Sequence, residues 1–421
     1  MWIESLSIIA ALFMAHPLAT AFLVVALEVP RYTFAILVVG INALRGKKQV
    51  APNNKTVSAI VPVFNGGWEV LTTLQSLINQ TEPLHQIIII DDGANDIHRD
   101  QLCDLVRQHA NMQLVTHRAR AGKSAAVNHG AFLATGELLL TIDHDTCLDP
   151  NACRELTQAF DDPEVAAASG NLLVANRQRN LLTSLQSFEY MLSIGIGKLF
   201  LRYFSAISCC SGAFSMFRAS AFRSVGGLNV GPGEDLEITL RLRQAGHKIS
   251  FIDDALAETT VPQTVKDLYR QRLRWDGDAL VIRVFMYREL SFFKRHEPLA
   301  NSLQRLDYIF LELLPTVSFP VYLIFLWLTY NTDIVDVLIA IYVVLFWLYV
   351  LNIVLGMIVT KRALSWLDLL VLPVMPLYQG LIMRLVRFIA ISDEILLARS
   401  QRDSYVPPHI RHALYGNHKH D

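Results

Sequence analysis

The chain has 421 residues, of which 52% are hydrophobic and 18% are charged, and its mean hydropathy is +0.33. Ordinary soluble domains contain about 45–50% apolar and about 25% charged residues, so this composition predicts a membrane protein with two to three domains. A net charge of -1 gives no basic field, which excludes a nucleic-acid-binding protein. Five cysteines without a CxxC pair indicate neither a disulfide framework nor a zinc site.

The first apolar block runs from Leu6 to Leu44 and is interrupted around Pro30. A helix needs roughly 17–25 apolar residues to cross a bilayer, so residues 1–48 are predicted to form a membrane anchor of either one or two spans. A cleaved signal peptide is disfavoured, because no basic segment precedes this block and no clear small-residue cleavage site follows it.

Residues 53–262 have the mixed composition of a soluble domain, with strand and helix patterns in alternation. Strands are predicted at residues 56–64, 86–90, 112–116 and 137–142, and helices at residues 70–78 and 123–134. The run Gln86–Ile90 is almost wholly apolar, which is typical of a strand buried on both faces of a parallel sheet between helices. The predicted fold is therefore α/β, with ligands bound beyond the carboxyl ends of the strands.

Acidic residues follow two of these strands, Asp91 and Asp92 after one, Asp143 and Asp145 after another. In an extended segment, residues two apart point the same way, so Asp143 and Asp145 are predicted to hold Mg²⁺ or Mn²⁺ against a diphosphate. Simpler roles stay open, a turn former for Asp91 or Asp92 and a helix cap for the second pair. Lys123 begins a predicted helix, where backbone amides and the helix dipole favour an anion.

A helical stripe of leucine and phenylalanine runs through residues 181–199 and fits either a helix at the membrane surface or an ordinary packed helix. Farther on, Glu234 and Asp235 follow a Gly/Pro turn and precede a helix predicted at residues 236–245. A catalytic base needs a carboxylate on such a turn, whereas helix capping would also explain one of the two.

The segment QRLRW places Gln271, Arg274 and Trp275 on one helical face, at positions i, i+3 and i+4. Together they present an amide, a guanidinium group for a phosphate and a ring on which a sugar stacks. Taken singly, the arginine fits an ion pair and the tryptophan a membrane-interface anchor. The convergence of three such groups favours a binding site.

Residues 306–392 are predicted to form a C-terminal transmembrane region, in which Ile309–Tyr330 and Val335–Thr360 make a helical hairpin. Basic residues follow the first apolar block and flank the hairpin, but are absent from its turn, which places the middle domain in the cytoplasm. The block 363–390 contains prolines and charges, so a span, a re-entrant piece and an interfacial helix all stay open. Residues 393–421 are a polar tail.

The motifs VPVFN, IDDG, DHD, GED and QRLRW occur in this order within one domain between hydrophobic ends. This arrangement resembles the processive family 2 membrane glycosyltransferases, which include cellulose, chitin, hyaluronan and poly-N-acetylglucosamine synthases. The resemblance covers residues 56–275 and implies a GT-A-like nucleotide-sugar-binding domain flanked by transmembrane helices. It also implies that residues 263–305 hold the QxxRW motif and interfacial helices.

The resemblance assigns a role to each motif residue. Asp235, with Glu234, matches the catalytic carboxylates, and Asp235 the general base. Asp143 and Asp145 match the ligands of a Mg²⁺ or Mn²⁺ ion. The residues that match the nucleotide-sugar site are Asp91, Asp92, Lys123, Asp143, Gln271, Arg274 and Trp275.

The implied protein is an inverting, multi-pass glycosyltransferase of the bacterial inner membrane with a cytoplasmic catalytic domain. It would polymerise UDP-N-acetylglucosamine or another UDP-hexose and pass the polysaccharide outward, with accessory membrane subunits as candidate partners. The alternative is transfer of one sugar to a polyprenyl phosphate or another lipid. A non-catalytic receptor is disfavoured by the intact acidic motifs. GED stands where the family has TED, and only three to five hydrophobic segments are present, which leaves the product length open.

Overall fold

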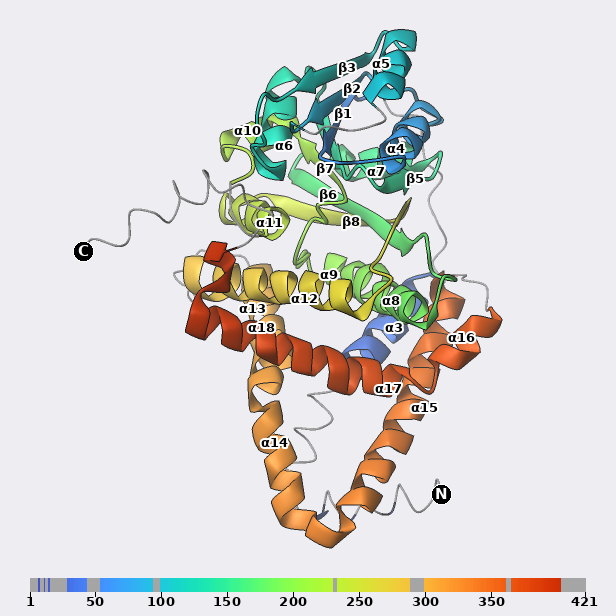
Figure 1. Ribbon diagram of the computed structural model, residues 1–421, viewed down its shortest axis with the longest axis vertical. Helices are drawn as coiled ribbons and strands as arrows, with labels where there is room; N and C mark the ends of the chain where they lie inside the picture. Colours follow the sequence, from blue (N-terminus) through green and yellow to red (C-terminus); the bar gives the residue numbers. More distant parts are fainter. Residues whose placement is uncertain are drawn as a thin grey trace, which may run out of the picture.

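The computed structural model describes residues 29–43, 54–93, 99–229, 233–287, 299–360 and 365–402, together with a few isolated positions before residue 16. Its strands are β1 Val57–Val63, β2 Gln86–Asp91, β3 Met112–Thr116, β4 Leu138–Ile142, β5 Thr146–Leu148, β6 Val165–Val174, β7 Phe214–Arg218 and β8 Lys248–Thr259. They form one sheet in the order β3-β2-β1-β4-β7-β6-β8-β5. Helices surround this sheet, and a helical hairpin projects away from it (Figure 1).

The first half of the sheet is parallel. Strands β3, β2, β1 and β4 all run in the same direction. All seven residues of β1 are buried, as is the apolar run 87–90 of β2. These strands and the α/β fold were predicted from the sequence and are confirmed. Because parallel strands end at the same edge, the residues that follow β2 and β4 are brought together there.

The second half of the sheet differs from the parallel arrangement that the sequence predicted. Strand β7 is antiparallel to both β4 and β6, and β5 is antiparallel to β8, whereas β6 and β8 are parallel. The sheet is therefore mixed. In the antiparallel pair, Phe214 at the start of β7 lies opposite Ile142 at the end of β4. This register places the segment before β7 beside the acidic residues after β4, and the Asp143 N–H donates to the carbonyl of Ala213 at 3.2 Å.

One long helical element lies below the sheet in Figure 1 and consists of α8 Leu181–Tyr190, a π-helical stretch η2 Met191–Gly197 and α9 Lys198–Arg202. Phe188 and Ile196 are fully buried within it. The element contacts β6 and β8 on one side and two apolar helices, α3 Val29–Ala43 and α15 Ile334–Thr360, on the other. Of the two roles that the sequence left open, the structure favours the packed helix.

The other helical segments follow the predicted pattern, with differences of one or two residues at the predicted ends. They are α4 Glu69–Ile78, α5 Arg99–Gln108, α6 Lys123–Leu133, α7 Ala152–Thr157, η1 Gln158–Asp161, α10 Ala219–Ser224, α11 Glu234–Gln244, α12 Val265–Leu280, η3 Val281–Met286, α13 Leu299–Asp307, η4 Tyr308–Leu313, α14 Leu314–Tyr330, η5 Asn331–Asp333, α16 Trp366–Val371, α17 Met375–Leu377, η6 Tyr378–Met383, α18 Arg384–Leu397 and η7 Arg399–Arg402.

The predicted C-terminal hairpin is present as α14 and α15, which diverge from the turn at residues 331–333 (Figure 1). Asn331 has a φ of 32° and reverses the chain there. Residues 300–360 form one continuous helical stretch that is apolar and long enough to cross a membrane, and it is the only such stretch in the described part of the chain. A buried hydrogen bond of 2.8 Å from the Thr33 hydroxyl to Asn352 Oδ1 ties α3 to α15.

The predicted N-terminal anchor lies largely outside the described residues. Its described part is α3, whose 15 residues are about 22 Å long at 1.5 Å per residue, against a bilayer core of about 30 Å. The basic residues at 45–48, 294–295 and 361–362, used for the topology prediction, also fall outside the described part.

The block 363–390 contains short helices and α18, which runs alongside α12 and crosswise to the hairpin (Figure 1). Arg387 on α18 pairs with Asp276 on α12 at 3.2 Å, and Arg384 is buried. Because α18 is held against the base of the sheet domain rather than along the hairpin, this arrangement favours the interfacial helix among the three forms left open.

The hairpin gives a testable topology. We expect a reporter inserted in the turn at residues 331–333 to be active only outside the cytoplasm, and one inserted at Lys361 to be active only inside. The reason is that basic residues flank the hairpin and are absent from its turn. Alkaline phosphatase and green fluorescent protein fusions at both sites measure this. Phosphatase activity at Lys361 would contradict the predicted orientation.

Candidate active site

A cavity of about 790 Å³ opens at the edge where β1, β2 and β4 end, and α11 and α12 form its opposite wall. Nearly all the predicted site residues line it, although they are spread over about 180 positions of sequence. They are Asp92, Lys123, Asp143, Asp145, Glu234, Asp235, Gln271, Arg274 and Trp275. The structure thus brings together residues that the sequence could only place on separate elements.

Asp91 is the one predicted residue that does not line this cavity. It ends β2, is 5% exposed, and pairs with Arg99 at 3.2 Å. Asp92 does reach the cavity, but its carboxylate accepts hydrogen bonds from the N–H groups of Ala121 and Gly122 at 2.8 and 2.7 Å. The His117 ring lies 2.8 Å from the same carboxylate. The anion predicted at the start of α6 is therefore the protein's own Asp92.

Lys123, the first residue of α6, turns its ammonium group into the cavity. Its Nζ lies 2.5 Å from Asp143 Oδ1 and 3.5 Å from Glu234 Oε1, and it donates to the Gly212 carbonyl at 3.3 Å. Burial alone would lower the pKa of Lys123, but the carboxylates of Asp143 and Glu234 outweigh it and raise that pKa above its ordinary value. The lysine is therefore a fixed positive charge at the centre of the site.

Asp143 and Asp145 do not lie on an extended segment, as the sequence argument assumed. A turn closed by the Thr146 N–H on the Asp143 carbonyl at 3.1 Å brings both carboxylates to the cavity instead. The capping alternative is wrong for this pair, because the helix that follows is capped at Asn151. Burial raises the pKa of Asp145, and the Asp143 carboxylate adds to the rise.

This pair of carboxylates suits a divalent cation. Mg²⁺ is usually held by one or two carboxylates, with substrate phosphates completing its shell. The described residues contain no cluster of three or more metal-binding side chains, so a cation here would depend on oxygens from the substrate. Two close carboxylates, one of them buried, fit that description.

Asp235 lies in the first turn of α11, and Gly233 occupies the cap position of that helix without a side-chain cap bond. The Asp235 carboxylate accepts from the Gly212 N–H at 2.9 Å through Oδ2 and from the Leu236 N–H at 2.7 Å through Oδ1. It is thus oriented rather than used as the helix cap. A Cβ on Gly212 would lie 3.0 Å from Lys123 Nζ and 3.4 Å from Asp235 Oδ2, so only glycine allows both side chains to approach this closely.

Helix α12 carries the QRLRW motif along the other wall of the cavity. Gln271, Arg274 and Trp275 all line it, as predicted, and Trp275 is 37% exposed. The Gln271 Oε1 atom is buried and has no hydrogen-bond partner among the described residues. A buried amide oxygen of this kind is costly unless a ligand or water satisfies it, which favours a binding role.

Arg272, the second residue of the motif, was not predicted to have a role. It forms a bidentate pair with Glu189 on α8, at 2.7 and 3.0 Å, and its guanidinium group lies 4.7 Å from the centre of the Trp275 ring. Tyr378 donates to the same glutamate at 2.8 Å. This buried cluster holds α12 and its tryptophan in place. No local pattern reveals it, because Glu189 is 83 residues away.

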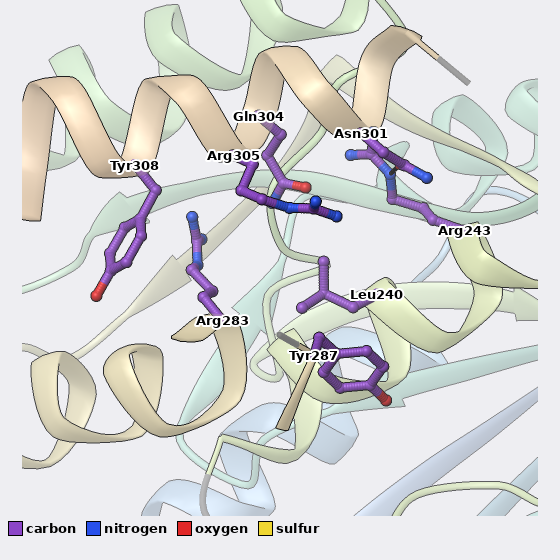
Figure 2. Close-up of a pocket in the computed structure, with 8 residues that line it drawn as sticks. All are labelled: Leu240, Arg243, Arg283, Tyr287, Asn301, Gln304, Arg305 and Tyr308. Atoms are coloured by element: carbon purple, nitrogen blue, oxygen red, sulfur yellow. Dashed lines mark hydrogen bonds between the residues drawn. The ribbon is translucent and has the colours of Figure 1, made fainter. Parts of the chain in front are cut away.

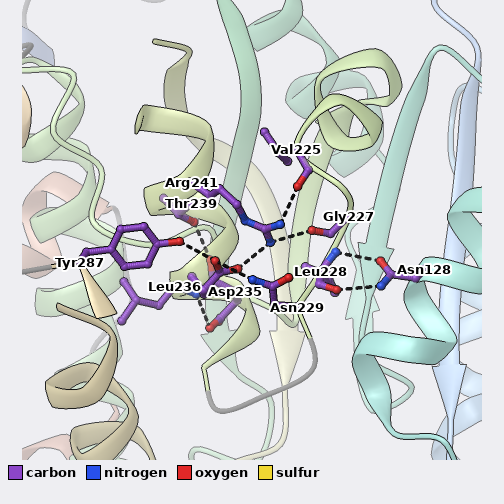
Figure 3. Close-up of polar contacts among 11 residues, drawn as sticks. Asn128, Val225, Gly227, Leu228, Asn229, Asp235, Leu236, Thr239, Arg241 and Tyr287 are labelled. Atoms are coloured by element: carbon purple, nitrogen blue, oxygen red, sulfur yellow. Dashed lines mark hydrogen bonds and ion pairs between the residues drawn. The ribbon is translucent and has the colours of Figure 1, made fainter. Parts of the chain in front are cut away.

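A second polar cluster supports the acidic turn from behind, as Figure 3 shows. The buried carboxylate of Glu237 accepts from Tyr287 at 2.5 Å, from Arg241 at 2.6 Å and from Asn229 at 3.0 Å. Arg241 also donates to the carbonyls of Val225 and Gly227. The chain that leads into Glu234 and Asp235 is therefore anchored on both sides of the described gap at residues 230–232.

A separate, much smaller cavity of about 30 Å³ lies between α11, η3 and α13. Figure 2 shows its lining side chains, which include three arginines, Arg243, Arg283 and Arg305. Arg283 also borders the large cavity. No predicted site residue lines the small cavity, so the candidate site is the large one.

The comparisons with known proteins agree with this site. Residues 58–226 match the model of Glycosyl transferase family 2. The hyaluronan synthase of Streptococcus pyogenes is 30% identical over 262 residues, which is 58% of this chain and 62% of that protein. The poly-beta-1,6-N-acetyl-D-glucosamine synthase of Staphylococcus epidermidis is 30% identical over 233 residues, which is 54% of this chain and 56% of that protein. The chain carries a family 2 glycosyltransferase domain, and the resemblance predicted from the motifs is confirmed.

The chain spans about three fifths of the length of the curated relatives it matches. A solved structure of similar fold is the mannosyltransferase PcManGT of Pyrobaculum calidifontis, described in complex with GDP-Man and Mn²⁺. The TM-score is 0.57, the sequence identity is 17%, and the match covers 90% of this chain and 99% of that one. This likeness agrees with the GT-A-like α/β fold.

The carboxylate pair gives a prediction about nucleotide binding. We expect Asp145→Asn to weaken the Mn²⁺-dependent affinity for UDP at least about tenfold, because it removes a charged oxygen ligand. Calorimetry on the purified protein measures this, with EDTA expected to lower wild-type affinity to the mutant level. The matched control is Asp104→Asn on the surface of α5, which should bind like wild type. Unchanged affinity in Asp145→Asn would contradict the cation site.

Proposed function

We propose that this chain is an inverting membrane glycosyltransferase that polymerises the sugar of UDP-N-acetylglucosamine or another UDP-hexose into an extracellular polysaccharide. The observation that carries this proposal is the convergence of the DxD carboxylates, Lys123, Asp235 and the α12 motif on one cavity. A carboxylate pair, fixed cations, an oriented carboxylate and an exposed ring are the parts that sugar transfer requires. The names of the two relatives favour a polysaccharide as the product.

The donor would bind with its diphosphate between α6 and α12. Lys123 and Arg274 approach from these two helices and neutralise the phosphates, and Asp92 holds the loop that precedes α6. Asp143 and Asp145 would hold Mg²⁺ or Mn²⁺, which stabilises the charge of the nucleoside diphosphate as it leaves. Asp91 is expected to act at the nucleoside end, a role that rests on the family resemblance alone.

The acceptor would bind on the Asp235 side of the cavity, with a sugar ring stacked on Trp275. Asp235 takes the proton from the acceptor hydroxyl as its oxygen attacks the anomeric carbon. The bond from that carbon to the diphosphate breaks on the opposite face, so the configuration inverts and no covalent enzyme intermediate forms. Glu234 supports this chemistry through its contact with Lys123 at 3.5 Å.

The apolar helices would place the site at the inner face of a bacterial membrane. The hairpin, together with the N-terminal block, makes the protein multi-pass, and α18 and α12 lie at the interface, from which the growing chain is passed outward. The partners of this protein are then the UDP-sugar, the polysaccharide, the bilayer and candidate accessory membrane subunits. The alternative is transfer of one sugar to a polyprenyl phosphate or another lipid, which the same cavity could catalyse.

Product analysis separates these functions. Membranes that contain the full chain are incubated with radiolabelled UDP-sugars in parallel, and the products are sized before and after lipid extraction. We expect one donor to be incorporated into chains of many sugars that remain in the aqueous phase. A product of a single sugar that partitions into organic solvent would favour the lipid-acceptor alternative, and no transfer from any donor would contradict both.

The assignment of the base gives a separate prediction. Asp235→Asn keeps the shape of the side chain but removes its basicity, so turnover should fall about 10²–10⁴-fold while UDP affinity stays within a few-fold of wild type. Turnover and UDP binding are measured on the same purified variant, with Asp104→Asn as the matched control. Near-normal turnover in Asp235→Asn would reject the base assignment.

A further inference from the structure

A third wall of the cavity comes from the helical element below the sheet, which carries no motif residue. Tyr190, Ile194 and Lys198 follow one another at four-residue intervals and all line the cavity. The π-helical stretch η2, residues 191–197, lies between the first and the last of them. Such stretches are rare and frequently occur at functional sites.

Lys198 on this wall is a buried cation without a carboxylate partner. Its side chain is part of a residue that is only 7% exposed, and its ammonium group lies 2.6 Å from the Ser211 hydroxyl and 3.4 Å from the Ser169 hydroxyl. Within the described part of the chain, no carboxylate lies within ion-pair distance of it. An ammonium group has three donors, so at least one is left for a ligand.

Other buried cations of this protein are compensated. Arg272 pairs with Glu189, Arg241 pairs with Glu237, and Lys123 pairs with Asp143. Burying a charge without a partner costs several kcal/mol in general, and hydroxyl groups offset this only in part. Local violations of this kind are expected at functional sites, where a ligand supplies the missing partner.

The position of Lys198 indicates which part of the substrate it meets. Its partner Ser211 adjoins Gly212, whose N–H donates to the Asp235 carboxylate at 2.9 Å. The ammonium group therefore lies beside the carboxylate that would deprotonate the acceptor. The diphosphate already has Lys123 and the carboxylate pair on the other side of Gly212.

We propose that Lys198 is a sugar-binding residue, which donates a charge-assisted hydrogen bond to an oxygen of the sugar held next to Asp235. This inference rests on the proposed function, because it takes the ligand to be a sugar. Both the transferred sugar and the terminal sugar of the acceptor have oxygens that accept such a bond. The bond positions the sugar for attack and plays no part in binding the uridine diphosphate.

Lys198→Met tests this proposal, because methionine keeps the length and apolar stem of lysine and removes the charge. A hydrogen bond to a charged group contributes about 1.5–3 kcal/mol, so kcat/KM for the UDP-sugar should fall roughly 10- to 150-fold. UDP affinity should stay within a few-fold of wild type, and the melting temperature should equal or exceed that of wild type, since an uncompensated charge is removed. The matched control is Lys248→Met on the exposed part of β8, which should retain wild-type kinetics.

Further arms of the same experiment decide the source of the oxygen. A raised KM for the UDP-sugar assigns the contact to the donor sugar, and a raised KM for an oligosaccharide acceptor assigns it to the acceptor. Lys198→Gln, which keeps a donor without the charge, should be intermediate, and it provides a second folded variant.

Four results would overturn the inference. They are wild-type kinetics in Lys198→Met, a loss of UDP affinity equal to the loss of kcat/KM, a lower melting temperature with unchanged kcat/KM, and failure of both Lys198 variants to fold. A wild-type protein that transfers no sugar from any donor would overturn the proposed function and this inference with it. A wild-type protein that turns over beside an equally active Lys198→Met would overturn this inference alone.

Discussion

The two halves of the cavity are joined at Gly212. Its N–H orients Asp235, its carbonyl accepts from Lys123, and a side chain at this position would crowd both groups. The glycine is held there because β7 pairs antiparallel with β4, which sets the segment before β7 beside Asp143. Without this pairing, the carboxylate pair after β4 and the acidic turn of α11 would have no common neighbour.

Charge pairing around the cavity separates residues that hold the architecture from residues left to meet a ligand. Arg272 is pinned by Glu189 and fixes α12, and Glu237 gathers three donors behind the acidic turn. These clusters are satisfied within the protein, so they give the walls of the cavity rigidity. Gln271 Oε1 and the ammonium group of Lys198 face the same space with fewer partners among the described residues, which is where binding free energy is available.

Asp92 illustrates how a correct location can conceal a different role. A carboxylate at a strand end and a helix start rich in backbone amides were both expected to serve a ligand. In the folded chain the carboxylate accepts from those same amides, at 2.7 and 2.8 Å, and shapes the loop before Lys123. Two features that each suggested an external partner satisfy one another, because the parallel strands β2 and β3 bring the two segments together.

The sequence by itself determined the parallel strands, the hairpin and nearly every motif residue at the cavity, because these follow from local hydrophobic periodicity and from short motifs at strand ends and helix starts. Only the tertiary structure decided the antiparallel strands β7 and β5, the turn that presents Asp143 and Asp145, and the separation of Asp91 from the cavity. The same holds for Arg272 with Glu189 and for Lys198 with Ser211. These contacts join residues that are distant in the chain or lie on packed faces, and local pattern carries no record of which distant group will lie opposite a given side chain.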